Sequence, residues 1–160
     1  MNEVHSLAII DDEPEMVDML SEALTDNFVV NKFPSADAVV EQIQAGASYD
    51  IYLTDISMPG TNGIEFLKWL RLKDIMAPVI VITGFAEKEN AMQAIEHGSF
   101  AMIEKSFHFG NVFAIVNRAS AYLLLQEITD ELLIRYSELI ETFDKQKERL
   151  SKIYNRLKQH

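Results

Sequence analysis

The sequence predicts an α/β fold in which five parallel strands form a doubly wound sheet, followed by a long C-terminal α-helix. Short apolar runs alternate with stretches of helical spacing along the first part of the chain, and no glycine or proline follows Gly110. Alternation of strand and helix predicts parallel strands, right-handed crossovers and helices on both faces of the sheet. At 160 residues the chain is long enough for one such domain and an appendage.

Five apolar runs are expected to form the strands. Residues 6–10, 51–54 and 79–83 are rich in Val and Ile and bounded by turn residues, as is typical of strands covered on both faces. Residues 28–33 and 100–104 complete the set.

Four helices are expected between these strands. Pro14 stands near the start of the first helix, and Ser35 can cap the second, which should end at Gly46. Apolar residues at helical spacing over 64–70 and 91–95 predict the third and fourth helices, and the fourth should end at Gly98.

Polar side chains stand at the carboxyl ends of the predicted strands: Asp11, Asp12, Asp55, Thr83 and Lys105. Ligands of doubly wound sheets bind at this edge, so these residues are expected to lie together. An aspartate that attacks a phosphoryl group brings one anion against another, and a divalent metal on oxygen ligands reduces that repulsion. Because Mg²⁺ takes few carboxylates besides phosphate and water, Asp12 and Asp55, with Asp11 acting through water, would suffice. The set outlines a phosphoryl-transfer site.

Each of these residues alone also has an ordinary structural explanation. Asp11 and Asp12 could cap the first helix, and Asp55 could be a solvated turn residue. Thr83 could be a turn hydroxyl, and Lys105 an exposed lysine at a strand end. Their conjunction at matching strand ends favours the site.

The motifs around these residues resemble the receiver domain of two-component response regulators. They are the paired acids after the first strand, DISMPG around Asp55, ITG at 82–84 and GSFAMIEK at 98–105. Each motif alone is weak, but their order and spacing are specific, and the similarity covers roughly residues 4–125. The resemblance implies a flavodoxin-like sheet with the strand order 2-1-3-4-5.

The resemblance also implies the roles of the site residues. Asp55 would be the phosphoacceptor, supplied by a sensor histidine kinase or phosphotransfer protein, and Lys105 and Thr83 would contact the phosphoryl group. The protein would then catalyse only its own phosphorylation and autodephosphorylation. The metal ligands for Mg²⁺ would be Asp11, Asp12, Asp55 and the backbone carbonyl of Ser57.

The chain departs from the family pattern beside Lys105. Met102 stands where receivers commonly carry an aromatic switch residue, and Ser106 replaces the usual cis-proline after the lysine. A cis bond without proline costs about 3 kcal/mol, so a trans bond or a shifted loop is expected, and the readout of phosphorylation should differ. Phe85 and Ser57 occupy positions that tune phosphoryl lifetime in the family. The bulky Phe85 predicts slow to moderate autodephosphorylation.

Composition limits the classes of function. The net charge of −11 belongs almost entirely to the first part of the chain, which makes nucleic-acid binding there unfavourable. No apolar run reaches the roughly 20 residues of a membrane helix, and no secretory leader pattern is present, so a cytoplasmic protein is expected. The chain has no cysteine, which excludes disulfides, and its four histidines lack metal-ligand spacing.

The stretch after Gly110 predicts one helix, of roughly 75 Å if it reaches the end of the chain. We expect residues 1–125 to form the receiver and 126–160 a helical extension continuous with the fifth helix. Apolar residues at Leu133, Ile140 and Tyr154 widen a heptad stripe, so a four-helix bundle or packing on a partner competes with a two-stranded coil, and a lone amphipathic helix is the simplest alternative. Position a is taken by Tyr122, Thr129, Tyr136, Phe143, Leu150 and Leu157, and position d by Leu125, Leu132, Leu139, Gln146, Ile153 and His160.

Three functions compete at this point. The first is a phosphorylation-controlled module that forms a homodimer or relays a signal through its C-terminal helix. The second is a phosphorylation-independent dimeric scaffold, which Met102 and Ser106 favour. The third is a small-molecule phosphatase, which would need an acid where Ser57 stands. The basic final stretch is expected to be a solvated face rather than a nucleic-acid-binding helix, and the heptads suggest a piece of a longer regulator.

Overall fold

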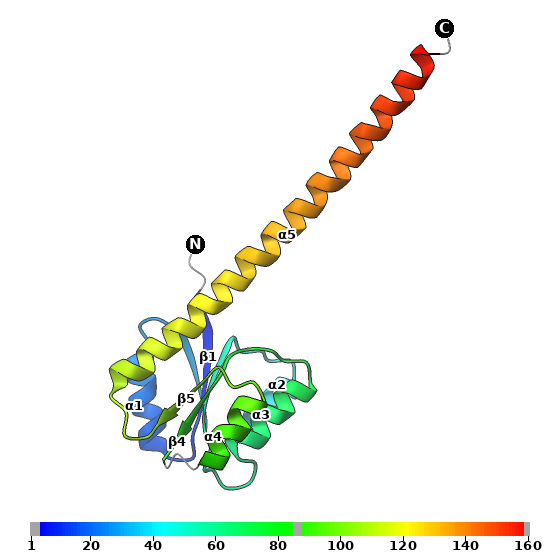
Figure 1. The fold of residues 1–160 in the computed structure, drawn as a ribbon. Coiled ribbons are helices and arrows are strands. Elements are labelled where there is room, and N and C mark those ends of the chain that lie inside the picture. The colour runs from blue at the N-terminus through cyan, green and yellow to red at the C-terminus, as the bar shows by residue number, and fades with distance from the viewer. Residues whose placement is uncertain (1–3, 85–87, 159–160) are drawn as a thin grey trace. The chain divides into compact units, whose positions relative to one another are not determined.

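The computed structural model describes residues 4–84 and 88–158 and divides into two compact units, Met1–Ala121 and Tyr122–His160 (Figure 1). In the first unit, five parallel strands form one sheet in the order β2-β1-β3-β4-β5. The predicted flavodoxin-like doubly wound fold is confirmed. The strands are β1 Ser6–Ile10, β2 Val29–Phe33, β3 Ile51–Asp55, β4 Val79–Thr83 and β5 Ala101–Glu104. The helices are α1 Pro14–Leu24, α2 Ala36–Gln44, α3 Gly63–Leu72, α4 Lys88–Glu96 and α5 Phe109–Leu157.

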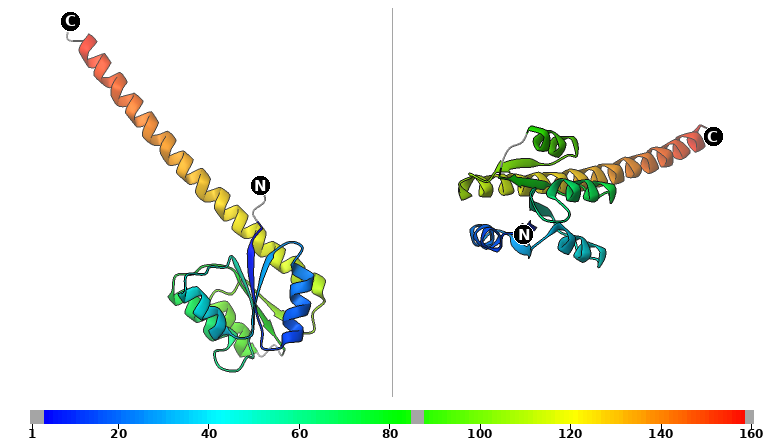
Figure 2. Two further views of the ribbon diagram at one scale, coloured as in Figure 1. Left: turned by 180° about the vertical axis from the view of Figure 1, so that it is seen from behind. Right: turned by 90° about the horizontal axis from the view of Figure 1, so that it is seen from below.

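The sheet is covered on both faces, because alternate residues of each strand point to opposite sides. On one side, Ala8, Tyr52 and Val81 belong to a core cluster shared with α2, α3 and α4. On the other side lie α1 and the first turns of α5, whose Val112 and Val116 are buried. Figures 1 and 2 show this three-layer arrangement. Covered faces leave the ends of the strands as the accessible edges of the sheet.

Local signals explain where the helices begin and end. The side chain of Ser35 accepts a hydrogen bond from the backbone N–H of Ala38 at 3.2 Å and caps α2, as predicted. Asn62 and Glu65 form a reciprocal capping box at the start of α3, which fixes the helix directly after the β3–α3 loop. After α2, Gly46 has a φ of 102°, a left-handed conformation that favours glycine.

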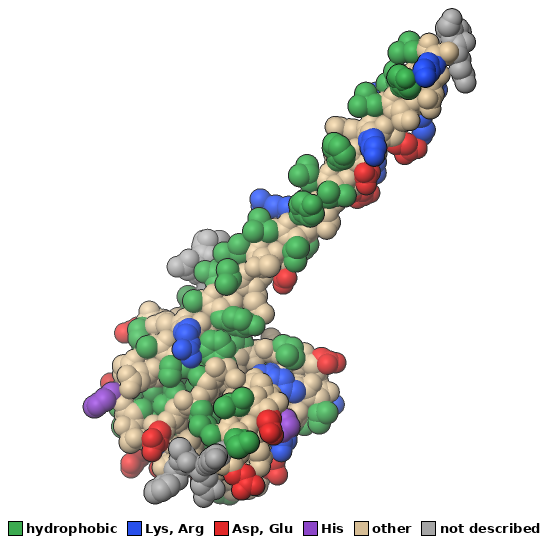
Figure 3. Space-filling model, viewed as in Figure 1, with side chains coloured by type: hydrophobic (Ala, Val, Ile, Leu, Met, Phe, Trp, Pro, Cys, Tyr) green, Lys and Arg blue, Asp and Glu red, His purple; other side chains and the backbone are tan. Residues whose placement is uncertain are grey.

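The second unit is helical to Leu157 as part of α5. Three ion pairs on its exposed surface stabilise the helix, each between residues four positions apart: Glu131 with Arg135, Glu141 with Lys145 and Glu148 with Lys152. Apolar side chains of this unit are exposed as well, and many gather on the face seen in Figure 3. Among the residues described, none of the helices combines the length and apolar character needed to span a membrane.

Candidate functional site

The carboxyl ends of the strands bring the predicted site residues together. Asp55 is the last residue of β3 and Thr83 the last of β4, while Asp11 follows β1 and Lys105 follows β5. Backbone hydrogen bonds continue the ladders past the strands. The N–H of Asp11 donates to the carbonyl of Phe33 at 3.2 Å, and the N–H of Lys105 donates to the carbonyl of Thr83 at 2.7 Å. The sheet itself therefore positions the side chains that follow it.

A glycine lets α3 begin directly beside Asp55. The N–H of Gly63 donates to the carbonyl of Ile56 at 3.1 Å. A Cβ atom at Gly63 would overlap the backbone carbonyl of Asp55. Only glycine fits this approach of α3 to the end of β3, so Gly63 fixes the loop that carries Ser57. Ser57 lies exposed in that loop, two residues after Asp55.

Three carboxylates form a cluster that could hold a metal ion. One oxygen from each of Asp11, Asp12 and Asp55 lies within 4.8 Å of the others. Asp11 is 2% exposed and Asp55 1% exposed, whereas Asp12 faces solvent. In the described part of the chain, the buried Oδ2 of Asp11 and Oδ1 of Asp55 have no hydrogen-bond partner. Buried carboxylate oxygens without donors are costly, and a hard divalent cation such as Mg²⁺ fits this set of oxygen ligands.

Lys105 is the cation of the site. Its Nζ lies 2.7 Å from Oε1 of Glu13, 3.1 Å from Oδ2 of Asp55 and 3.5 Å from Oδ2 of Asp11. Burial alone would lower the pKa of Lys105, but the hydrogen bonds to Glu13 and Asp55 and the charges of Asp55 and Asp11 outweigh it, and the pKa is raised. Lys105 therefore stays protonated and offsets the negative charge around Asp55.

For Asp11, in contrast to Lys105, the surroundings disfavour the charged form. Its burial raises the pKa, and the negative charge of Asp55 adds to this effect, although the backbone N–H of Glu13 donates to Oδ1 of Asp11 at 2.9 Å and works against it. A nearby cation stabilises a buried carboxylate with a raised pKa, because it offsets the negative charge. The electrostatics of Asp11 thus agree with the metal-ligand chemistry of the cluster.

Glu13 was missed by the sequence reasoning. It is the N-cap residue of α1, and its carboxylate makes the shortest contact of Lys105. The available signal was a third acid after Asp11 and Asp12. Three consecutive acids next to a helix start are ordinary in sequence terms, because acids are favourable in the first turn.

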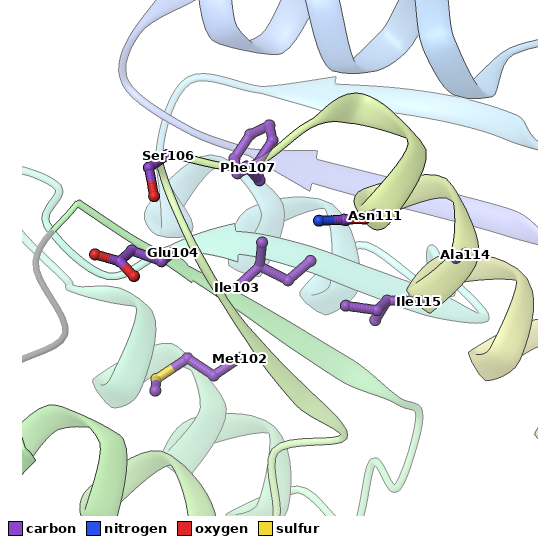
Figure 4. A pocket seen from close by; sticks show the side chains of 8 residues that line it. All are labelled: Met102, Ile103, Glu104, Ser106, Phe107, Asn111, Ala114 and Ile115. Carbon is purple, nitrogen blue, oxygen red and sulfur yellow. The ribbon is translucent and has the colours of Figure 1, made fainter.

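The two departures from the family pattern lie beside a cavity between β5 and α5 (Figure 4). Met102 is half-buried and packs against the core cluster, while Ser106 is exposed. No described peptide bond is cis, so the bond before Ser106 is trans, as predicted. Phe85, expected to influence phosphoryl lifetime, lies outside the described residues. The cavity of about 440 Å³ is lined by Met102, Ile103, Glu104, Ser106, Phe107, Asn111, Ala114 and Ile115.

This geometry agrees with a comparison against protein families. A family model for the response regulator receiver domain matches residues 7–117. The chain belongs to this family. The matched residues include β1 from Leu7 onward, β2 to β5 and every site residue discussed above.

Two curated proteins that are similar to this chain are regulators. The chain is 32% identical over 132 residues to the regulatory protein AtoC of Escherichia coli strain K12, a match that covers 82% of this chain and 28% of AtoC. It is 32% identical over 124 residues to the transcriptional regulatory protein FixJ of Rhizobium meliloti strain 1021, covering 77% of this chain and 60% of FixJ. The receiver thus spans less than two thirds of either relative.

Solved structures confirm the fold. The receiver domain protein of Methanospirillum hungatei JF-1 matches with a TM-score of 0.72, covering 78% of this chain and 99% of that one, at 20% identity. At this identity the likeness concerns the fold alone.

Proposed function

We propose that this receiver accepts a phosphoryl group on Asp55 from a sensor histidine kinase or a phosphotransfer protein. The observation that supports this most directly is the ion pair of 3.1 Å between Lys105 and the buried carboxylate of Asp55, beside two further acids. A carboxylate oxygen of Asp55 attacks phosphorus, and the bond from phosphorus to the donor histidine breaks with its electron pair on nitrogen. The product is an acyl phosphate on Asp55.

The other residues of the site would handle the negative charge of this transfer. Lys105 donates hydrogen bonds to the phosphoryl oxygens, and the Thr83 hydroxyl at the end of β4 donates another. When bound, Mg²⁺ would neutralise charge between Asp55 and the phosphoryl group, held by Asp11, Asp12, Asp55 and the carbonyl of Ser57. In this role the protein turns over no other substrate.

The test of this role is direct phosphorylation. Incubation with a small phosphodonor such as acetyl phosphate and Mg²⁺ should add the mass of one phosphoryl group, detected by intact-protein mass spectrometry. The Asp55→Asn variant should gain none, and chelation of Mg²⁺ should abolish the reaction in the wild type. A wild type that gains no phosphoryl group from this donor or from a histidine kinase would refute the proposal.

We also propose that residues 126–160 form a homodimer or relay the signal, in continuity with the receiver over 1–125. Leu132, Tyr136 and Leu139 support this, because all three are exposed at heptad positions. The proposal places the chain in the cytoplasm, where its donor acts. The net charge of −11 argues against nucleic acid as a partner of this chain.

A phosphorylation-independent scaffold is the second candidate, favoured by Met102 and Ser106. Mass in solution distinguishes the two, measured with Mg²⁺ and with or without beryllofluoride as a phosphoryl mimic. A change that is lost in Asp55→Asn supports the switch. An identical dimer under every condition supports the scaffold.

A further inference from the structure

Three carboxylates compete for Lys105 in the resting structure. Its ammonium group carries three N–H donors, and three carboxylates surround it: Glu13 at 2.7 Å, Asp55 at 3.1 Å and Asp11 at 3.5 Å. A phosphoryl group on Asp55 brings further oxygens that need donors. Two of the three N–H donors already bond to Glu13 and Asp55, so the phosphoryl oxygens compete with these contacts for Lys105.

The three carboxylates differ in how easily they release Lys105. Asp11 and Asp55 are buried, and removing their cation would leave buried charge uncompensated. Glu13 has 61% of its side-chain surface exposed, so water can replace Lys105 at little cost. The shortest contact of Lys105 is therefore also its most replaceable one.

We propose that Glu13 holds Lys105 in the unphosphorylated protein and loses it to the phosphoryl group on Asp55. Glu13 is then a positioning residue that acts through Lys105 and opposes phosphorylation. This inference rests on the proposed function, but it concerns a residue for which the resemblance to receivers implied no role. Release of Lys105 by Glu13 would also couple the state of Asp55 to the start of α1, where Glu13 is the N-cap residue.

The inference predicts the direction of an affinity change. The Glu13→Gln variant should bind beryllofluoride about two- to five-fold more tightly than the wild type at saturating Mg²⁺, because an exposed ion pair no longer competes for Lys105. Isothermal titration calorimetry measures this affinity. Glu15→Gln is the matched control. Glu15 is an exposed acid in the first turn of α1, and the described ion pairs do not include it. Its loss removes the same charge without touching Lys105.

A double-mutant cycle tests whether Glu13 acts through Lys105. In a Lys105→Met background, Glu13→Gln should change the affinity for beryllofluoride no more than Glu15→Gln does. An equal gain in both backgrounds would show a general charge effect and overturn the inference. So would an unchanged or weaker affinity of the single Glu13→Gln variant.

A second measurement does not depend on phosphoryl chemistry. The NMR signals of the Lys105 side chain, recorded without Mg²⁺, should shift in Glu13→Gln and stay in place in Glu15→Gln. Unshifted signals would show that the resting contact is absent, which overturns the inference while leaving phosphorylation of Asp55 intact. A wild type that fails to bind beryllofluoride would instead reject the proposed function, and the inference with it.

Discussion

At Gly63 the first residue of α3 comes so close to the end of β3 that the backbone leaves no room for a side chain. The site depends on several such single-residue features. Asp11 and Asp55 are buried acids, and Lys105 provides the cation between them. In the resting site, Lys105 offsets the negative charge of these buried carboxylates, one of which would accept the phosphoryl group. Changes at these residues should therefore affect the stability of the receiver, its proposed phosphorylation, or both.

Gly63→Ala should both destabilise the receiver and impair phosphorylation. The added Cβ atom overlaps the carbonyl of Asp55, and relief requires a shift of α3 or of the β3–α3 loop. Overpacking of this kind costs about 1–3 kcal/mol in the free energy of unfolding. Urea denaturation and the rate of labelling by acetyl phosphate measure the two effects. Gly110→Ala is the control, since a Cβ there meets no atom within 4 Å. Equal behaviour of the two variants would contradict the argument.

Asp11→Asn should stabilise the Mg²⁺-free protein at neutral pH. The pKa of Asp11 is raised above the ordinary value of 3.8, so the folded state binds its proton more tightly than the unfolded state. The contribution of Asp11 to stability is thus fully present below pH 3.8 and is lost as pH rises through the raised pKa. We therefore expect a higher free energy of unfolding for Asp11→Asn than for the wild type at pH 7.

Urea denaturation with a chelator at several pH values measures this gain. The advantage of Asp11→Asn should shrink toward pH 4, and Asp26→Asn, at an exposed position, is the control for the loss of one negative charge. Adding Mg²⁺ should stabilise the wild type more than Asp11→Asn, because binding to the folded state alone adds to its stability. An advantage for Asp11→Asn that grows as pH falls would contradict the assignment.

At the scale of elements, most of the fold was predictable because local signals agree with the tertiary structure. Apolar runs gave β1 and β4 with the bounds observed. Phe28 lies outside β2, since its N–H still bonds to Leu24 at the end of α1. The partner of Glu13 was not predictable, because Lys105 lies 92 residues away and meets it only through the order of the strands. Contacts of this kind depend on topology, which local patterns do not contain.

The caps of α2 and α3 should differ in strength. Asn62 accepts hydrogen bonds from the N–H groups of Ile64 and Glu65, both at 2.9 Å, and belongs to a capping box. Ser35 accepts a single bond at 3.2 Å. Asn62→Ala should therefore cost about 1 kcal/mol or more in the free energy of unfolding, and Ser35→Ala less. Urea denaturation of both variants measures the difference, and a larger loss for Ser35→Ala would disprove the ranking.

At the scale of the whole molecule, the surfaces of the two units differ in net charge and in exposed apolar side chains. The excess of acids belongs to the receiver, while the second unit exposes Leu132, Leu139 and Phe143 at heptad positions. A single helix with so much exposed apolar surface is typical of a segment that packs against a partner. The proposed phosphorylation and the proposed assembly should therefore respond to different substitutions.

Leu139→Lys should disrupt the proposed homodimer without affecting phosphorylation of Asp55. Leu139 is 65% exposed in the single chain and takes position d, so a dimer would bury it in both copies. Each buried leucine contributes roughly 1.5–3 kcal/mol, and loss of two should raise the dimer dissociation constant by at least about 100-fold. Sedimentation equilibrium measures this constant. Ser137→Lys, which adds the same charge at position b, should leave it nearly unchanged. Equal dissociation constants for Leu139→Lys and the wild type would exclude the a/d stripe as the interface, and the apolar residues at position e, Leu133 and Ile140, would be tested next.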